Sequence, residues 1–285
     1  MRSQPLHEFG GQGPVLHLAV ANGFPPQTYS PLLVPLTERF RVVSLPPRPL
    51  WPDPPPPAGV HSWSSIAGDL LAGLAQHQLR DVIGVGHSLG SIISLLAAVE
   101  ASGCFRAVIL LDPPLLPPWF LLGARLLQAV GLGGRLPLVQ GALRRRHRFA
   151  SHDEAFNYWR GKPLFHDWPD AALRLYVESM LRPAANGDGL ELAWSREWEA
   201  QLYRTLYTRP WSLLKRIPAG LPVLAIRGAT SHIFTAASAR AFCRVLPGAE
   251  LVEIEGAGHL FPHTAPDATR DAIVRWLHER GLSSS

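Results

Sequence analysis

The stretch DVIGVGHSLGSIISLLAA, residues 81–98, joins a short β-rich run to a longer run that is apolar nearly all round. Ser88 stands at the junction, with Gly86 two positions before it and Gly90 two positions after it. A strand that turns sharply into a helix leaves no room for side chains at those two positions. The segment therefore predicts a strand, a tight turn that presents the Ser88 hydroxyl, and a central helix over residues 89–101.

Short strand-like runs alternate with helical patterns on both sides of this segment. Apolar, β-rich runs predict strands at residues 15–21, 41–45, 81–86, 106–111, 222–227 and 249–254. Helical spacing of apolar residues predicts helices at residues 63–79, 89–101, 235–246 and 266–280. The alternation predicts the α/β class, with a doubly wound, mostly parallel sheet that is covered on both faces.

The alternation stops after Asp112. From residue 113 to residue 217 no strand signal is found, whereas helical stretches accumulate together with six of the nine Trp residues. We expect residues 113–217 to form an inserted helical lid, with residues 1–112 and 218–285 forming the core.

Composition and charge exclude several classes of protein. The formal net charge is +5, but the 27 basic residues are scattered among 22 acidic ones, which does not indicate a nucleic-acid partner. No signal peptide and no apolar run of transmembrane length is found, so a cytoplasmic protein without an integral membrane segment is expected.

The only dense basic run is RRRHR, residues 144–148. It is expected to be a solvated helix face, with a surface for anionic lipid or for a carboxylate-bearing substrate as the alternative. No cofactor or metal is expected, because no HExxH occurs and the glycines at residues 10–13 precede a strand rather than follow one.

Three motifs occur in an order that resembles the α/β-hydrolase superfamily, in its serine-nucleophile branch with a helical lid. GHSLG (86–90) resembles the nucleophile elbow, ANGFP (21–25) the oxyanion loop, and GAGHLFP (256–262) the histidine loop after the last strand. The resemblance implies that Ser88 is the nucleophile and that the backbone N–H groups of Phe24 and Leu89 form the oxyanion hole. A serine hydroxyl needs a base, and His259 in its glycine-rich loop is the candidate.

The third catalytic residue departs from the common pattern. Many members of the superfamily carry the acid after the next-to-last strand, but here that stretch reads RGATSHIF (227–234), with Ser231 and His232. Some members carry it one strand earlier, where this chain has Asp112. We expect Asp112 to orient His259. The alternatives are a capping role for Asp112 and a Ser88–His259 dyad without an acid.

A serine at the elbow argues against epoxide hydrolases and haloalkane dehalogenases, which use Asp there. It predicts hydrolysis of a carboxylic ester, thioester, lactone or amide through an acyl-serine. The expected pocket is lined by Asn22, Leu115, Trp119 and Phe120, which favours a small substrate with an apolar acyl or aryl group. A lyase or C–C hydrolase that uses the same pair of side chains, and a binding protein that has lost catalysis, are the rival interpretations. The oligomeric state is left open.

Overall fold

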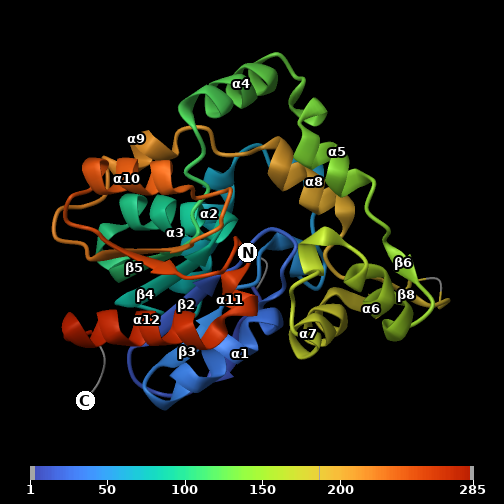
Figure 1. The fold of residues 1–285 in the computed structure, drawn as a ribbon, viewed down its shortest axis with the longest axis horizontal. Helices are drawn as coiled ribbons and strands as arrows, with labels where there is room; N and C mark the ends of the chain where they lie inside the picture. Colours follow the sequence, from blue (N-terminus) through green and yellow to red (C-terminus); the bar gives the residue numbers. More distant parts are fainter. Residues whose placement is uncertain (1–3, 186, 283–285) are drawn as a thin grey trace.

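The computed structural model describes residues 4–185 and 187–282, and a seven-stranded sheet forms its centre (Figure 1). The strand order is β1-β3-β2-β4-β5-β9-β10. The strands are β1 (His7–Gly10), β2 (Val15–Ala19), β3 (Arg41–Ser44), β4 (Val82–His87), β5 (Phe105–Leu111), β9 (Val223–Gly228) and β10 (Glu250–Ile254). The six expected strands are present and mutually parallel, which confirms the α/β class. The short edge strand β1, which was not expected, pairs antiparallel with β3.

Helices cover both faces of this sheet. Figure 1 shows α2 (Trp63–Gln76), α3 (Leu89–Glu100) and α10 (Ala236–Val245) on one face, and α1 (Ser30–Leu33), α11 (Phe261–Thr264) and α12 (Pro266–Glu279) on the other. All six residues of β4 are buried, which explains its continuous apolar sequence. Helix α3 is buried along most of its length because it lies between the sheet, α2 and α9 (Pro210–Leu214). Short 3₁₀ helices are η1 (Pro26–Tyr29), η2 (Val34–Glu38), η3 (Arg48–Leu50), η4 (Pro57–Gly59), η5 (Ser102–Cys104), η6 (Gly133–Arg135) and η7 (Pro163–Phe165).

The chain leaves the sheet after β5 and returns at β9, which pairs with β5. The intervening segment contains α4 (Pro118–Ala129), α5 (Pro137–Leu143), α6 (His152–Arg160), α7 (Asp170–Met180), α8 (Arg196–Arg204) and α9. The expectation that it lacks strands is wrong, because β6 (Arg148–Phe149), β8 (Leu190–Leu192) and β7 (Leu181–Pro183) form a small antiparallel sheet. Strands of two or three residues are too short to show an alternating pattern.

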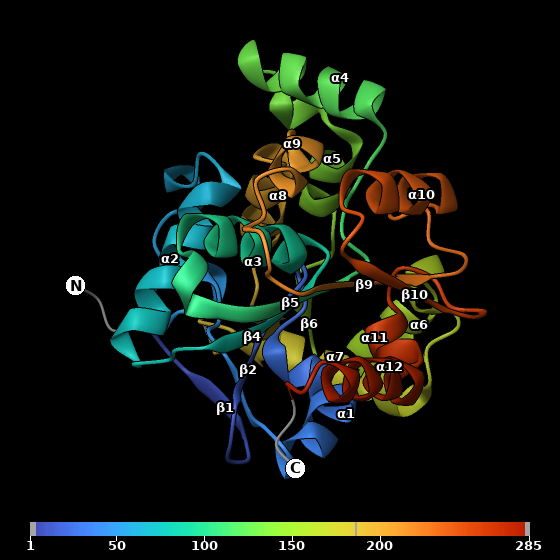
Figure 2. The same ribbon diagram turned by 90° about the vertical axis from the view of Figure 1, so that its left-hand side faces the viewer.

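Within this segment α4 stands apart. Figures 1 and 2 show it projecting from the body of the molecule, at the far side of α5 and α8 from the small sheet. No helix among the described residues has both the length and the apolar character needed to cross a membrane.

Candidate active site

Ser88 occupies a strained turn between β4 and α3. Its backbone has φ 51° and ψ −114°, a conformation that is unfavourable for a residue with a side chain. A Cβ atom at Gly86 would lie 2.4 Å from the carbonyl oxygen of Gly90, and one at Gly90 would lie 2.0 Å from that of Ala19. Both glycines are therefore required by close backbone contacts, and the turn has the shape that the sequence predicts.

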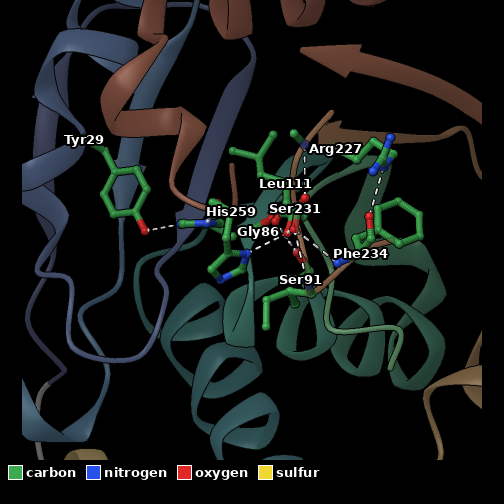
Figure 3. A network of polar contacts seen from close by, with 12 residues as sticks. Tyr29, Gly86, Ser91, Leu111, Arg227, Ser231, Phe234 and His259 are labelled. Atoms are coloured by element: carbon green, nitrogen blue, oxygen red, sulfur yellow. Dashed lines mark hydrogen bonds and ion pairs between the residues drawn. The ribbon is translucent and has the colours of Figure 1, made fainter. Parts of the chain in front are cut away.

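Asp112 directly follows β5 and is fully buried, with a backbone φ of 45°. Its Oδ1 accepts a hydrogen bond from the backbone N–H of Gly228 at 3.1 Å. Its Oδ2 accepts one from Ser231 Oγ and one from His259 Nδ1, the latter at 2.6 Å (Figure 3). Three donors from two loops thus fix the carboxylate in one orientation.

His259 reaches this carboxylate because its loop crosses the end of β9. A Cβ atom at Gly228 would lie 2.3 Å from the carbonyl oxygen of Gly258, so only glycine lets the two backbones approach this closely. The backbone N–H of Thr230 donates to the carbonyl of Ala257 at 3.0 Å and holds the loop down. With Nδ1 bonded to Asp112, the ring leaves Nε2 available.

A chain of hydrogen bonds connects the His259 loop to the elbow. The backbone N–H of Ala21 donates to the hydroxyl of Tyr29, which donates to His87 Nδ1 at 2.7 Å. His87 Nε2 then donates to the carbonyl oxygen of His259 at 3.0 Å. Burial, together with the nearby rings of His259 and His263, holds the pKa of His87 well below its usual value, so the ring is neutral and directs these bonds.

Ser88 itself is tied into the same edge of the sheet through its backbone. Its N–H donates to the carbonyl of Leu111, the residue before Asp112, at 2.9 Å. His87, its neighbour in sequence, has its ring centre 5.1 Å from that of His259. The structure therefore gathers Ser88, Asp112 and His259 at the carboxyl ends of β4 and β5. Ser88 Oγ makes no hydrogen bond to the described residues.

The loop after β2 lies beside the elbow. Gly23 has φ 82°, and Asn22 is buried, with its Nδ2 donating to the carbonyl of Glu199 at 3.0 Å. The backbone N–H of Phe24 donates to the carbonyl of Ala21 at 3.2 Å, so this expected donor takes part in a turn. Leu89 is the first residue of α3, where backbone N–H groups lack partners within the helix.

An ion pair supports this loop from the inserted segment. Arg145 Nη1 donates to Glu199 Oε2 at 2.6 Å, and its Nη2 donates to the hydroxyl of Tyr176. A Cβ atom at Gly23 would lie 3.5 Å from both Arg145 and Glu199. The expectation of a solvated helix face for RRRHR is therefore wrong for Arg145, whose side chain is only 16% exposed, and the run follows α5 rather than forming a helix.

The comparisons with known proteins agree with this geometry. Residues 15–272 match the family model described as "Alpha/beta hydrolase family". The chain belongs to this family. It is 26% identical over 273 residues to 2-(acetamidomethylene)succinate hydrolase of Mesorhizobium japonicum, which covers 94% of this chain and 89% of that protein. The similarity in sequence and fold to hydrolases makes this protein an enzyme of the hydrolase class.

Solved structures show the same fold. The structure of E-2-(acetamidomethylene)succinate hydrolase superposes with a TM-score of 0.78 at 26% identity, covering 96% of this chain and 94% of that one. A thioesterase domain from the curacin biosynthetic pathway gives a TM-score of 0.71 at 16% identity, with 94% of each chain covered, which shows the fold alone.

The four residues expected to line a pocket in this hydrolase lie in different settings. Asn22 is buried beside the elbow, and Leu115 is fully buried. Phe120 is half-buried on α4, whereas Trp119 on the same helix is 75% exposed. The Trp119 indole is therefore largely open to solvent.

Sequence reasoning missed the buried residues that support the site. His263 stacks on Trp168 with ring centres 4.9 Å apart, and its Nε2 lies 3.2 Å from Thr28 Oγ1. Burial lowers its pKa to about 3. Neither these residues nor Tyr29 carries a local sequence signal, because their contacts join segments more than 50 residues apart.

Proposed function

We propose that this hydrolase cleaves carboxylic esters, or the related thioesters and lactones, through an acyl-serine at Ser88. The observation that carries the proposal is the 2.6 Å hydrogen bond from His259 Nδ1 to Asp112 beside the strained turn at Ser88. A base that is oriented by a buried carboxylate, close to a half-buried serine, is the arrangement that activates a serine hydroxyl.

In the proposed reaction His259 Nε2 removes the proton from Ser88 as Oγ attacks the substrate carbonyl carbon. The tetrahedral intermediate collapses, the bond to the leaving alcohol or thiol breaks, and His259 returns the proton to that group. Water then attacks the acyl carbon as it gives a proton to His259 Nε2. The bond from that carbon to Ser88 Oγ breaks, His259 returns the proton to Oγ, and the acid leaves. Asp112 keeps the proton of His259 on Nδ1 throughout and stabilises the imidazolium. The Ser88–His259 hydrogen bond forms in the substrate complex, since such bonds tighten there.

The developing oxyanion would be met by two backbone N–H groups, those of Leu89 and Phe24. Leu89 opens α3, whose amino-terminal end favours negative charge. The Phe24 N–H would be shared between the oxyanion and the carbonyl of Ala21, from which it lies 3.2 Å. Losing one such donor typically costs ~3 kcal/mol of transition-state stabilisation.

An apolar acyl or aryl group is the proposed substrate feature. Arg145 is the cation placed against the loop after β2, and it is already bonded to Glu199 and Tyr176. Burial opposes its charge, but those two partners outweigh it and raise the pKa of Arg145. A substrate carboxylate would have to displace Glu199, so a neutral, apolar group fits better. Residues 113–217 are proposed to act as the lid over this site.

The test is hydrolysis of p-nitrophenyl esters with acyl chains of increasing length. Ser88→Ala should abolish turnover and labelling by a fluorophosphonate, and unchanged turnover would refute the proposal. Ser94→Ala is the matched control because this serine lies in α3, the helix that follows Ser88, is fully buried and has an unpartnered Oγ. It should keep both properties.

A second candidate is hydrolysis of an amide or a C–C bond on the same residues. It is favoured by the similarity to 2-(acetamidomethylene)succinate hydrolase, whose name specifies an acetamido group and a dicarboxylate. Turnover of an acetamido-substituted acid without ester turnover would select amide hydrolysis. Turnover of a diketone without fluorophosphonate labelling would select C–C cleavage. Tight binding of an apolar ligand with no turnover would indicate a protein that has lost catalysis.

A further inference from the structure

Helix α4 carries an exposed apolar stripe. Trp119, Leu122, Leu126 and Val130 are 75%, 56%, 59% and 67% exposed. Their spacing of three and four residues places them on one side of the helix and its C-cap. The opposite side is already used, since Leu121 and Ala124 are the buried residues of α4. We call these four exposed side chains the α4 face.

Exposed apolar residues are concentrated in this part of the chain. Nine large apolar side chains are exposed among the described residues, and six of them fall between positions 119 and 138. An exposed patch of this kind marks a contact surface rather than the ordinary scatter of single apolar residues.

The segment that carries the α4 face has side-chain charges of one sign. Residues 113–152 contain six Arg and neither Asp nor Glu. Two of these, Arg145 and Arg146, pair with Glu199 and Glu154 from later in the chain. Three others, Arg125, Arg135 and Arg144, are exposed and have no acidic partner in the described parts of the chain. The partner of this surface must therefore accept both apolar side chains and positive charge.

We propose that the α4 face binds an anionic lipid bilayer. A helix with Trp and Leu on one side and Arg beside them lies in the bilayer interface with its apolar side chains inserted. Each Arg near an anionic surface adds to the attraction. A second copy of this chain fits less well, because a symmetric contact would bring two acid-free, arginine-bearing segments together.

The position of α4 adds a consequence for the active site. Only residues 113–117 separate Asp112 from α4. Gln128 joins α4 to the end of α8, because its Nε2 donates to the carbonyls of Arg204, the last residue of α8, and of Leu206, each at 3.0 Å. A bilayer bound to the α4 face would contact the inserted segment, residues 113–217, that the proposed function treats as a lid. Membrane binding itself does not depend on that function.

The experiment measures sedimentation of the full chain with phosphatidylglycerol vesicles and with phosphatidylcholine vesicles. The double variant Leu122→Asp/Leu126→Asp removes the apolar stripe. The matched control Val34→Asp/Leu164→Asp makes the same change at two aliphatic side chains that lie outside the α4 face and are 47% and 55% exposed. Binding to phosphatidylglycerol should be weakened on the order of 100-fold in the α4 variant and unchanged in the control. It should also fall with added salt and be weak on phosphatidylcholine.

Fluorescence provides a second readout, because Trp119 is far more exposed than any other Trp of the described chain. A blue shift on adding phosphatidylglycerol vesicles should vanish in Trp119→Phe. Absence of vesicle binding, equal binding by the α4 variant, or a wild-type dimer that the α4 variant converts to monomer would each overturn the inference. Turnover of a water-soluble ester by the α4 variant is measured in parallel, so failure of the catalytic proposal is seen separately.

Discussion

Replacing Asp112 by Asn tests the proposed mechanism at one atom. Both carboxylate oxygens accept hydrogen bonds, Oδ1 from the backbone N–H of Gly228 and Oδ2 from Ser231 and His259. If the side-chain NH₂ of the new asparagine took the place of Oδ1, it would face the Gly228 N–H, and two donors would be in contact. The side-chain NH₂ must therefore take the place of Oδ2, where the Ser231 hydroxyl can rotate to accept a hydrogen bond from it.

This orientation reverses the tautomer of His259. An amide N–H at the Oδ2 position requires a lone pair on His259 Nδ1, which moves the ring proton to Nε2. In the proposed mechanism Nε2 is the nitrogen that accepts the proton of Ser88. Loss of the orienting carboxylate in a triad lowers the rate by ~10⁴, which corresponds to about 5.5 kcal/mol of transition-state stabilisation.

The assay is kcat/KM on a p-nitrophenyl ester, with unfolding by urea as a measure of stability. Asp267→Asn is the matched control because this carboxylate is exposed at the start of α12, and it should leave the rate unchanged. A fall of less than about tenfold in Asp112→Asn would refute the tautomer argument and leave a Ser88–His259 dyad.

A rescue variant separates loss of the carboxylate from general damage. Ser231 Oγ and His259 Nδ1 both bond to the same Asp112 oxygen, so a side chain at position 231 that is longer by one atom can approach the ring. Adding Ser231→Asp to Asp112→Asn should recover at least about tenfold of the lost rate. No recovery in a folded double variant would mean that the carboxylate must come from β5.

Three further predictions concern stability. Burial lowers the pKa of His17 and of His263 from 6.5 to about 3. Below pH 6.5 the unfolded chain therefore binds protons at these two side chains that the folded protein does not bind, so the free energy of unfolding is greatest above that pH and falls as the pH is lowered. Urea unfolding at about pH 5 should give a free energy of unfolding lower by about 2 kcal/mol for each of these two histidines than at about pH 8, and His17→Asn should remove the contribution of His17 to this pH dependence. Arg145→Met should lower the free energy of unfolding by about 3–5 kcal/mol, because it leaves the Glu199 carboxylate buried and unpaired. Adding Glu199→Leu should restore most of this stability, and no recovery would contradict the ion-pair explanation. Gly90→Ala places a Cβ atom 2.0 Å from a backbone carbonyl and should destabilise by about 3 kcal/mol or more in the same assay, whereas a neutral result would mean that the elbow can open.

The sheet could be predicted from the sequence because its signals are local. A buried parallel strand is a continuous apolar run, and each of the six expected runs forms a strand with ends shifted by two residues or fewer. The turn at Ser88 was equally visible, since Gly86 and Gly90 are the residues that its backbone contacts require. Strand β1 was missed because it has four residues at an edge and pairs irregularly with β3.

The surroundings of the site could not be predicted, because their contacts are distant in sequence. Arg145 lies in a run that reads as solvated, and its burial depends on Glu199, 54 residues later. Tyr29 is an unremarkable residue of η1 until the fold brings His87 to its hydroxyl. A chain of side-chain hydrogen bonds leaves no periodicity, so no pattern in the sequence indicates it.

The position of Asp112 explains why residues 227–234 contain no carboxylate. Leu111 and Ile226 are paired residues of neighbouring strands, so acids placed after either strand reach the same region. Two carboxylates there could not both be charged without strong repulsion. Ser231 avoids this, because its hydroxyl donates to Asp112 and its oxygen accepts the N–H groups of Ile233 and Phe234. When the carboxylate follows β5, as Asp112 does, a hydrogen-bond donor in the loop after β9 stabilises it better than a second acid would, and Ser231 is that donor in this chain.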